Sequence, residues 1–284
     1  MAAKPIPSST INSGYQKTAA AVDTHYIELI GKTVAILEVL HDYPDGLSLQ
    51  SLTEKTGQIK SSVHRILRSL MHHGYIEQDA PGGPYRLGMQ CLVLARRVRV
   101  ATSLVELARP YSRDLCESFD ESTYIAVLRD GRGIFLDVQE TKRDLRLVGP
   151  LGAEVHFHAT AAGKAMAAYF PKNRAEEFLS GLRQQHLTKR TLVSRSHVER
   201  EWATVRRLGY AVNDEETIQG AIFLAAPVFD AKGMICASIS IGLPKPRYSR
   251  KLGDQIVTRL KENCRRLSEA LDAAEYTHEN AFGG

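Results

Sequence analysis

The chain has 284 residues, of which 43% are hydrophobic and 24% charged, so it is long enough for about two domains and its composition excludes bulk disorder. Its 37 Lys and Arg against 32 Asp and Glu give a net charge of +5, which permits a nucleic-acid partner. Apolar runs are too short for a membrane helix, no secretory signal opens the chain, and the four cysteines form no CxxC pair; we therefore expect a cytoplasmic protein with free thiols.

The amino-terminal part of the chain predicts a tail followed by a helix. Residues 1–22 are rich in Ser, Thr, Ala and Pro, which is typical of a disordered segment. Apolar residues then recur at helical spacing at Ile30, Val34 and Leu37. The turn residues Pro44-Asp45-Gly46 end this first helix.

Two more helices and a hairpin follow within a predicted first domain, 24–88. Ser48 can cap a short second helix, and Gly57 can end it. A third helix is predicted over about 60–73, before Gly74. Two short extended runs, 75–79 and 85–87, flank the turn sequence APGGP. Three helices and a hairpin are the outline of a winged helix-turn-helix.

The third helix has one apolar face and one basic face. At 100° per residue, Ser61, Arg65 and Arg68 lie opposite the apolar stripe that includes Val63 and Leu67. No Asp or Glu occurs between the two glycines that bound this segment, so the outer face suits phosphate neutralisation and hydrogen bonding to base edges. The alternative is an ordinary solvated basic face. The predicted DNA-binding residues are Lys60, Ser61, Ser62, His64, Arg65, Arg68 and, on the hairpin, Arg86.

Within this set the position along the helix predicts the role. The amino-terminal end of such a helix enters the major groove, so Ser61, Ser62, His64 and Arg65 are the expected base readers. Arg68 lies one turn further on and is expected to contact phosphate.

A linker helix over 89–101 is expected to join the first domain to a second one over 102–275, with a tail at 276–284. Arg96, Arg97 and Arg99 of the linker could contact phosphate, or they could simply be solvated. The periodicity of the second domain predicts an α+β fold with a mostly antiparallel sheet. Its expected helices are 103–119, 160–169, 174–181, 197–209 and a last amphipathic helix, and its expected strands are 122–129, 133–140, 145–148, 210–213, 221–229 and 234–242.

Two features of the second domain indicate a small acidic ligand. Ser238 and Ser240 share one face of a strand, and we expect helices to cover only the other face, so that these hydroxyls meet water or line a pocket. Thr160, Ala161 and Ala162 begin a helix, whose free N–H groups and positive dipole end can bind an anion. Together they predict a carboxylate held by N–H groups and serine hydroxyls.

The stretch LSLQSLTEKTGQIKSSVHRILRSLMHHGYIEQDAPGGPYRLG resembles the winged helix-turn-helix of the IclR-type bacterial transcription regulators. The resemblance continues through SLVELARPYSRDL, FHATAAGKAMAAY, LGYAVNDEE and AAPVFDAKG. It implies a homodimeric or homotetrameric regulator with a GAF-like second domain that binds a small metabolite. The effector-binding positions that it implies are Thr160, Ala161, Ala162, Asn213, Ile222, Ser238 and Ser240.

We therefore expect a regulator, with repression favoured over activation, that binds a pseudo-palindromic operator in double-stranded DNA and responds to a small carboxylic acid. Leu92, Ala95 and the stripe on the first helix are candidate dimer contacts. The family often has Asp at the position of Asn213 and Pro at that of His156, so the effector itself stays open.

An enzyme is the alternative function. The GAF-like domain could turn over a small acid through Lys164, Glu215 or Cys236, although no nucleophile and base occur at a recognisable spacing. The run 213–216 is otherwise read as a hydrated strand end. His156 and His158 could hold a metal, but a plain histidine pair is favoured because no further ligand is tied to them. We expect no cofactor, no metal and no catalytic residue.

Overall fold

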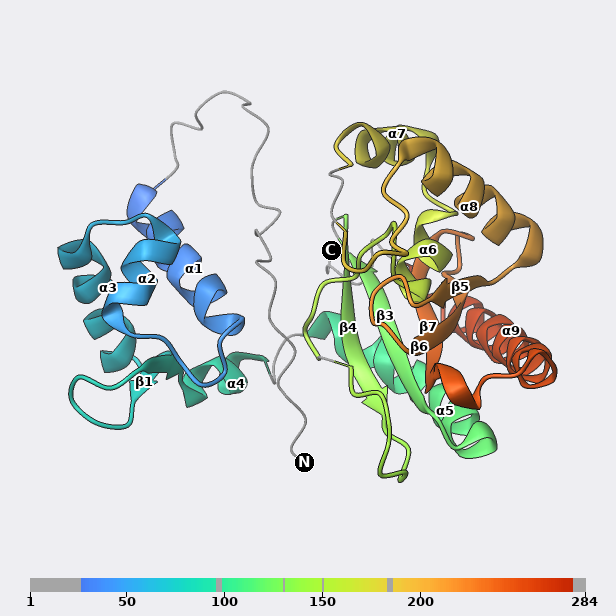
Figure 1. Ribbon diagram of the computed structural model, residues 1–284, viewed down its shortest axis with the longest axis horizontal. Helices are drawn as coiled ribbons and strands as arrows, with labels where there is room; N and C mark the ends of the chain where they lie inside the picture. Colours follow the sequence, from blue (N-terminus) through green and yellow to red (C-terminus); the bar gives the residue numbers. More distant parts are fainter. Residues whose placement is uncertain (1–26, 96–98, 130, 150, 183–185, 278–284) are drawn as a thin grey trace. The chain divides into compact units, whose positions relative to one another are not determined.

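The computed structural model describes residues 27–95, 99–129, 131–149, 151–182 and 186–277, and the chain divides into two units, Met1–Val98 and Arg99–Gly284 (Figure 1). The expected tail at 1–22 and the linker residues Arg96 and Arg97 lie outside the described residues. The expected linker segment contains α4 (Met89–Ala95) and the first residues of α5 (Arg99–Phe119).

The first unit has three helices followed by a hairpin, as the sequence predicts. Ser48 Oγ accepts a hydrogen bond from Ser51 N at 3.1 Å and so caps the second helix, which Gly57 ends with a φ of +65°. The two hairpin strands are antiparallel, and Leu47 extends them by a bridge to Tyr85. The elements are α1 (Glu28–His41), α2 (Leu49–Thr56), α3 (Lys60–His72), β1 (Ile76–Gln78) and β2 (Tyr85–Leu87).

A small hydrophobic core holds these helices together, but it leaves part of α1 uncovered. Ile36 and Leu40 of α1 are buried against residues of α2 and α3. Ile30 and Val34, which define the predicted apolar stripe, are instead 58% and 43% exposed. Helix α1 therefore carries a buried apolar face and a second apolar surface that the unit itself does not bury.

The second unit is an antiparallel five-stranded sheet in the order β4-β3-β7-β6-β5, which confirms the α+β class. Its strands are β3 (Ser122–Arg129), β4 (Arg132–Gln139), β5 (Ala211–Asp214), β6 (Ala221–Phe229) and β7 (Ile235–Pro244). Its further helices are α6 (Ala161–Ala167), α7 (Lys172–Ser180), α8 (Arg195–Leu208), the 3-10 helix η1 (Lys245–Arg247) and α9 (Arg250–Ala273).

The strand predicted at 145–148 is wrong, because this segment is an irregular loop. Leu145 and Val148 are 68% and 61% exposed, so the alternating pattern does not reflect a buried face. The carbonyls of the loop accept bonds from side chains: Arg247 Nη1 donates to Leu145 O at 3.0 Å and Tyr124 Oη donates to Leu147 O at 2.7 Å. Local alternation cannot supply the neighbouring strand that a sheet requires.

Helices cover both faces of the sheet, whereas the sequence predicted only one covered face. Helices α5 and α9 pack on one face, and α6, with α8 outside it, packs on the other (Figure 1). Ser238 and Ser240 of β7 pair with Ala126 and Tyr124 of β3 and lie on the α6 face. Both serines are buried, so they do not meet bulk water.

The folded second unit extends into the segment predicted as a carboxy-terminal tail. Tyr276 packs against the core, and its carbonyl accepts a hydrogen bond from Ala231 N at 2.9 Å. Residues 278–284 of that expected tail lie outside the described residues. No helix in the described part of the chain has the length and apolar character needed to cross a membrane.

Candidate functional site

Helix α3 presents a basic, carboxylate-free surface. Val63, Ile66 and Leu67 anchor the helix in the core of the first unit, which fixes the opposite face outward. Among the described residues, Arg65 and Arg68 form no ion pair, so their charges are available to an external anion. Six of the seven predicted DNA-binding residues lie on this helix: Lys60, Ser61, His64, Arg65 and Arg68, which are exposed, and Ser62, which is half-buried.

The seventh predicted residue, Arg86, is placed differently. It lies on β2, away from α3 in sequence, and forms an ion pair with Asp79 across the hairpin. Its side chain is only 31% exposed, and its Nε is buried without a hydrogen-bond partner in the described part of the chain. Because Asp79 already neutralises it, Arg86 is a weaker candidate for a phosphate contact than the exposed arginines of α3.

The start of α6 is built from small residues around a threonine cap. Thr160 Oγ1 accepts a hydrogen bond from Gly163 N at 3.0 Å and donates one to His156 O at 2.9 Å. A side chain at Gly163 would collide with the His156 carbonyl, which explains the glycine. Ala161 and Ala162 are buried in the core, so only their backbone N–H groups could meet a ligand.

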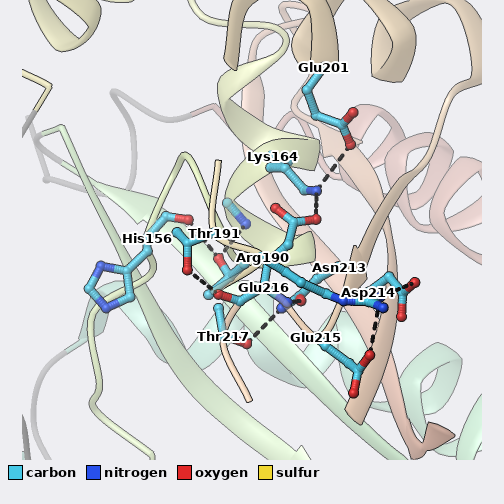
Figure 2. A network of polar contacts seen from close by, with 12 residues as sticks. His156, Lys164, Arg190, Thr191, Glu201, Asn213, Asp214, Glu215, Glu216 and Thr217 are labelled. Carbon is cyan, nitrogen blue, oxygen red and sulfur yellow. Dashed lines mark hydrogen bonds and ion pairs between the residues drawn. The ribbon is translucent and has the colours of Figure 1, made fainter. Parts of the chain in front are cut away.

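One turn into α6, Lys164 is a buried cation held between two carboxylates (Figure 2). The side chain is 1% exposed, and Nζ lies 2.5 Å from Glu216 Oε1 and 3.0 Å from Glu201 Oε1. Burial raises the pKa of Glu216 above its ordinary value, and Lys164 partly offsets this effect. The lysine thus joins α6 to α8 and to the segment that follows β5.

Asn213 holds the turn that brings Glu216 to this lysine. Its Oδ1 accepts a hydrogen bond from Glu216 N at 2.8 Å, and its Nδ2 donates to Thr217 Oγ1 at 2.7 Å. Glu215 has a φ of +62°, a left-handed conformation that is costly for a residue with a side chain. The run 213–216 is therefore not a hydrated strand end throughout, because Asn213 and Glu216 are buried.

The two serines of β7 lie beside an aromatic cluster on the α6 face. Ser240 pairs with Tyr124, whose ring centroid is 6.1 Å from that of Phe223 and 6.2 Å from that of Phe135. Ser238 Oγ is buried and has no hydrogen-bond partner among the described residues. An unsatisfied buried hydroxyl costs about 1–3 kcal/mol, so a further partner for this atom would be favourable.

The structure separates Ile222 from the other predicted effector-binding residues. Ile222 belongs to the core on the α5 and α9 side of the sheet, because it pairs with Leu243 there. Its neighbour Phe223 pairs with Gly242 and lies on the serine face instead. Successive side chains alternate between the faces of a strand. The prediction that Ile222 lies with the serines was therefore wrong, and the adjacent Phe223 occupies that face.

The residues of the enzymatic alternative do not converge. Lys164 is engaged by two carboxylates, and Glu215 pairs with Lys245 at 2.8 Å. Cys236 lies in the core on the α5 and α9 side, where burial raises the pKa of its thiol. Sequence reasoning missed Glu216 and Glu201 as partners of Lys164, because 52 and 37 residues separate them along the chain.

The histidine pair stays close together, with ring centroids of His156 and His158 5.9 Å apart. Burial lowers the pKa of His156, which favours its neutral form. Among the described residues, no group of three His, Cys, Asp or Glu could hold a metal ion. The geometry therefore gives this pair no third ligand.

Two family profiles match the chain. The one described as the IclR helix-turn-helix domain covers residues 29–80, and the one described as the bacterial transcriptional regulator IclR C-terminal domain covers residues 97–269. The chain is 31% identical over 248 residues to the HTH-type transcriptional regulator TtgV of Pseudomonas putida, covering 87% of this chain and 93% of that protein. It is 27% identical to the transcriptional repressor IclR of Escherichia coli, covering 91% and 96%.

The fold also matches solved structures. An IclR homolog from Microbacterium hydrocarbonoxydans, solved in complex with 4-hydroxybenzoate, superposes with a TM-score of 0.73 at 22% identity, covering 86% of this chain and 99% of that one. An IclR transcriptional regulator from Alicyclobacillus acidocaldarius gives a TM-score of 0.75 at 21% identity, covering 87% and 100%.

Proposed function

The chain belongs to the IclR family of bacterial transcription regulators, and from this premise we propose that it is a repressor controlled by a small carboxylic acid. The first unit, with α3 as recognition helix, binds a pseudo-palindromic operator. The second unit binds the acid on the α6 face of its sheet. The observation that carries the proposal is the exposed face of α3, which has cations and hydroxyls and no carboxylate.

The base readers in this proposal are Ser61, Ser62, His64 and Arg65, at the end of α3 that enters the major groove. Lys60 and Arg68 neutralise phosphates on either side. The exposure of the two arginines supports these roles, since neither forms an ion pair with a described residue that it would have to leave to bind DNA. Arg86 contributes to the wing only if DNA displaces Asp79 from it.

We propose that two copies associate through the apolar surface of the first unit. Large apolar side chains on α1 and α4 are exposed, including Ile30 at 58% and Leu92 at 63%. Apolar patches of this kind mark interaction surfaces. A dimer also doubles the number of base pairs read, which one helix cannot supply alone. The exposed large apolar residues on or beside these two helices, named the patch here, are Ile27, Leu29, Ile30, Val34, Met89, Leu92, Val93 and Leu94.

The effector site that we propose joins the α6 start to the serine face of β7. The N–H groups of Ala161 and Ala162 and the hydroxyls of Ser238 and Ser240 bind the carboxylate, with Thr160 shaping the helix end. The unsatisfied Ser238 Oγ supports this assignment, because a ligand oxygen would supply the missing partner. Asn213 acts indirectly, because its side chain holds the turn that carries Glu216.

Regulation, and not turnover, is the activity that we propose. The proteins to which the chain is similar are named as transcriptional regulators. The residues of the enzymatic alternative are paired or lie in the core, as described above. A regulator of this kind acts where bacterial DNA lies, so we place the protein in the cytoplasm.

In vitro selection tests the proposal. Purified full-length protein is incubated with a random duplex library, and bound DNA is enriched over several rounds in 150 mM salt. We expect a two-fold symmetric motif to emerge. Enrichment of no sequence would contradict specific operator binding, and a single unsymmetric motif bound by a monomer would contradict the dimer.

A further inference from the structure

An exposed isoleucine occupies the tip of the recognition helix. Ile59 immediately precedes α3 as its N-cap residue, and 77% of it is exposed. Single exposed apolar residues are common and need no explanation by themselves. This one lies at the end of the helix proposed to enter the major groove, between the turn and the donors Lys60 and Ser61.

The position is one where helix stability alone would favour a different residue. Four helices have a polar N-cap that accepts a hydrogen bond from the first turn, namely Ser48, Thr160, Ser194 and Ser249, whereas Ile27 of α1 and Pro171 of α7 give no such bond. Ile59 gives α3 no such bond. Replacing a capping side chain by an apolar one lowers the stability of a helix. The stability of α3 therefore does not explain why an isoleucine occupies this position.

The backbone holds the Ile59 side chain outward. The preceding Gln58 is half-buried and turns inward, where its Nε2 donates to Lys32 O of α1 at 3.0 Å. The Ile59 carbonyl accepts from Ser62 N at 2.9 Å and from Val63 N at 3.1 Å, which fixes the peptide at the start of α3. The side chain is therefore presented at the surface by an ordered turn.

We propose that Ile59 is a specificity-determining residue that packs on the C5-methyl group of a thymine in the operator. In the major groove, hydrogen-bonding groups line the base edges, and the thymine methyl is the apolar group that distinguishes T·A. Ile59 is the apolar group on a tip that otherwise carries donors, so the two surfaces are complementary. The inference rests on α3 being the recognition helix, as proposed above.

Deoxyuridine gives a sharp test, because it lacks only the methyl group of thymidine. Each thymine of the operator selected in vitro is replaced in turn by deoxyuridine, at the equivalent position of both half-sites at once, and binding is measured by fluorescence anisotropy. We expect one such position at which the wild-type dimer loses about fourfold in affinity for each half-site, about 16-fold in all, since one buried methyl group is lost in each half-site. Ile59→Ala should lose a similar factor on the thymine operator.

The losses of affinity caused by the deoxyuridine replacement and by Ile59→Ala should not be additive. On the deoxyuridine operator, wild type and Ile59→Ala should bind alike, because the methyl contact is already absent. Ile218→Ala, which truncates a 39% exposed isoleucine of the second unit, serves as the matched control and should bind both operators like wild type. An unchanged thermal midpoint will show that Ile59→Ala is folded.

Other outcomes overturn the inference. An equal loss for Ile59→Ala on both operators would assign the side chain to the sugar-phosphate backbone, and no loss on either would leave it without a role in binding. Both results would keep α3 as a recognition helix. If no sequence is enriched by the selection, the proposed function itself fails and takes this inference with it.

Discussion

Arg65 lies one turn into α3 on its outward face, and Ser69 Oγ donates to its carbonyl at 3.1 Å. Its side chain is exposed and forms no ion pair with the described residues. We predict that Arg65→Ala loses about 1–3 kcal/mol of binding free energy for each half-site of the selected operator, the value of one bidentate contact to guanine. Anisotropy titrations measure this change, with random DNA of the same length for comparison.

The contrast between the two DNAs assigns the role of Arg65. A base reader should lose little affinity for random DNA, because no guanine is fixed opposite it. Equal losses on the operator and on random DNA would place Arg65 among the phosphate contacts instead.

Arg68 lies past the turn of α3 that we propose enters the major groove, so a different result is expected. We predict that Arg68→Ala weakens binding to all sequences and reduces the slope of log K against log salt concentration by about one unit for each lost phosphate contact, about two units for the dimer. Titrations from 50 to 300 mM salt give this slope. A slope equal to that of wild type would show that Arg68 contacts no phosphate.

At the scale of the elements, Lys164 couples three segments of the second unit. We predict that Lys164→Met lowers the free energy of unfolding by about 3–5 kcal/mol, because Glu216 then stays buried without a cation. The double variant Lys164→Met/Glu216→Leu should recover most of the lost free energy of unfolding, since the remaining carboxylate, Glu201, is 28% exposed and can turn to water. Urea unfolding measures both; a double variant no more stable than the single one would contradict a charge effect.

The same network predicts how stability changes with pH. Burial raises the folded-state pKa of Glu216 above its ordinary value of 4.5. Protonated Glu216 therefore contributes fully to the stability of the folded protein below pH 4.5, and this contribution is lost as the pH rises through the folded-state pKa. Without Lys164 the pKa rises further. Lys164→Met should therefore be closer to wild type in stability at pH 5 than at pH 8. A difference that is constant between these pH values would contradict this interpretation.

Sequence patterns predicted most elements because their signals are local. The caps Ser48 and Thr160, the left-handed Gly57 and the stripe on α3 lie within a few residues of what they determine. Features that depend on distant segments were not predictable in this way. A strand at 145–148 had no neighbour to pair with, and Lys164 required Glu216 from 52 residues away.

The candidate site shows the same limit. The resemblance brought Ser238, Ser240 and the start of α6 to one side of the sheet, where the register places them. It also included Ile222, which the alternation of β6 turns to the other side. Periodicity fixes which residues share a face within one strand, but the register with neighbouring strands decides which face meets α6.

At the scale of the molecule, we expect operator binding to depend on association of two copies. We predict that Ile30→Glu or Leu92→Glu yields a monomer in analytical ultracentrifugation and lowers operator affinity by about 100-fold or more, because the second half-site no longer binds with the first. Met234→Glu, which changes an exposed apolar residue of the second unit, is the control. A dimer that survives both patch variants would show that the subunits associate elsewhere.

The most direct test of the account combines ligand and operator. A thermal-shift screen of small carboxylic acids identifies a ligand, and anisotropy then measures operator affinity with and without it. We predict that the acid changes operator affinity by about 5–150-fold, that operator DNA changes acid affinity by the same factor, and that Ser240→Ala weakens acid binding while ligand-free operator affinity is kept. An acid that binds the wild type and Ser240→Ala equally would contradict the proposed effector site, and an acid that leaves operator affinity unchanged would contradict the proposed regulation by that acid.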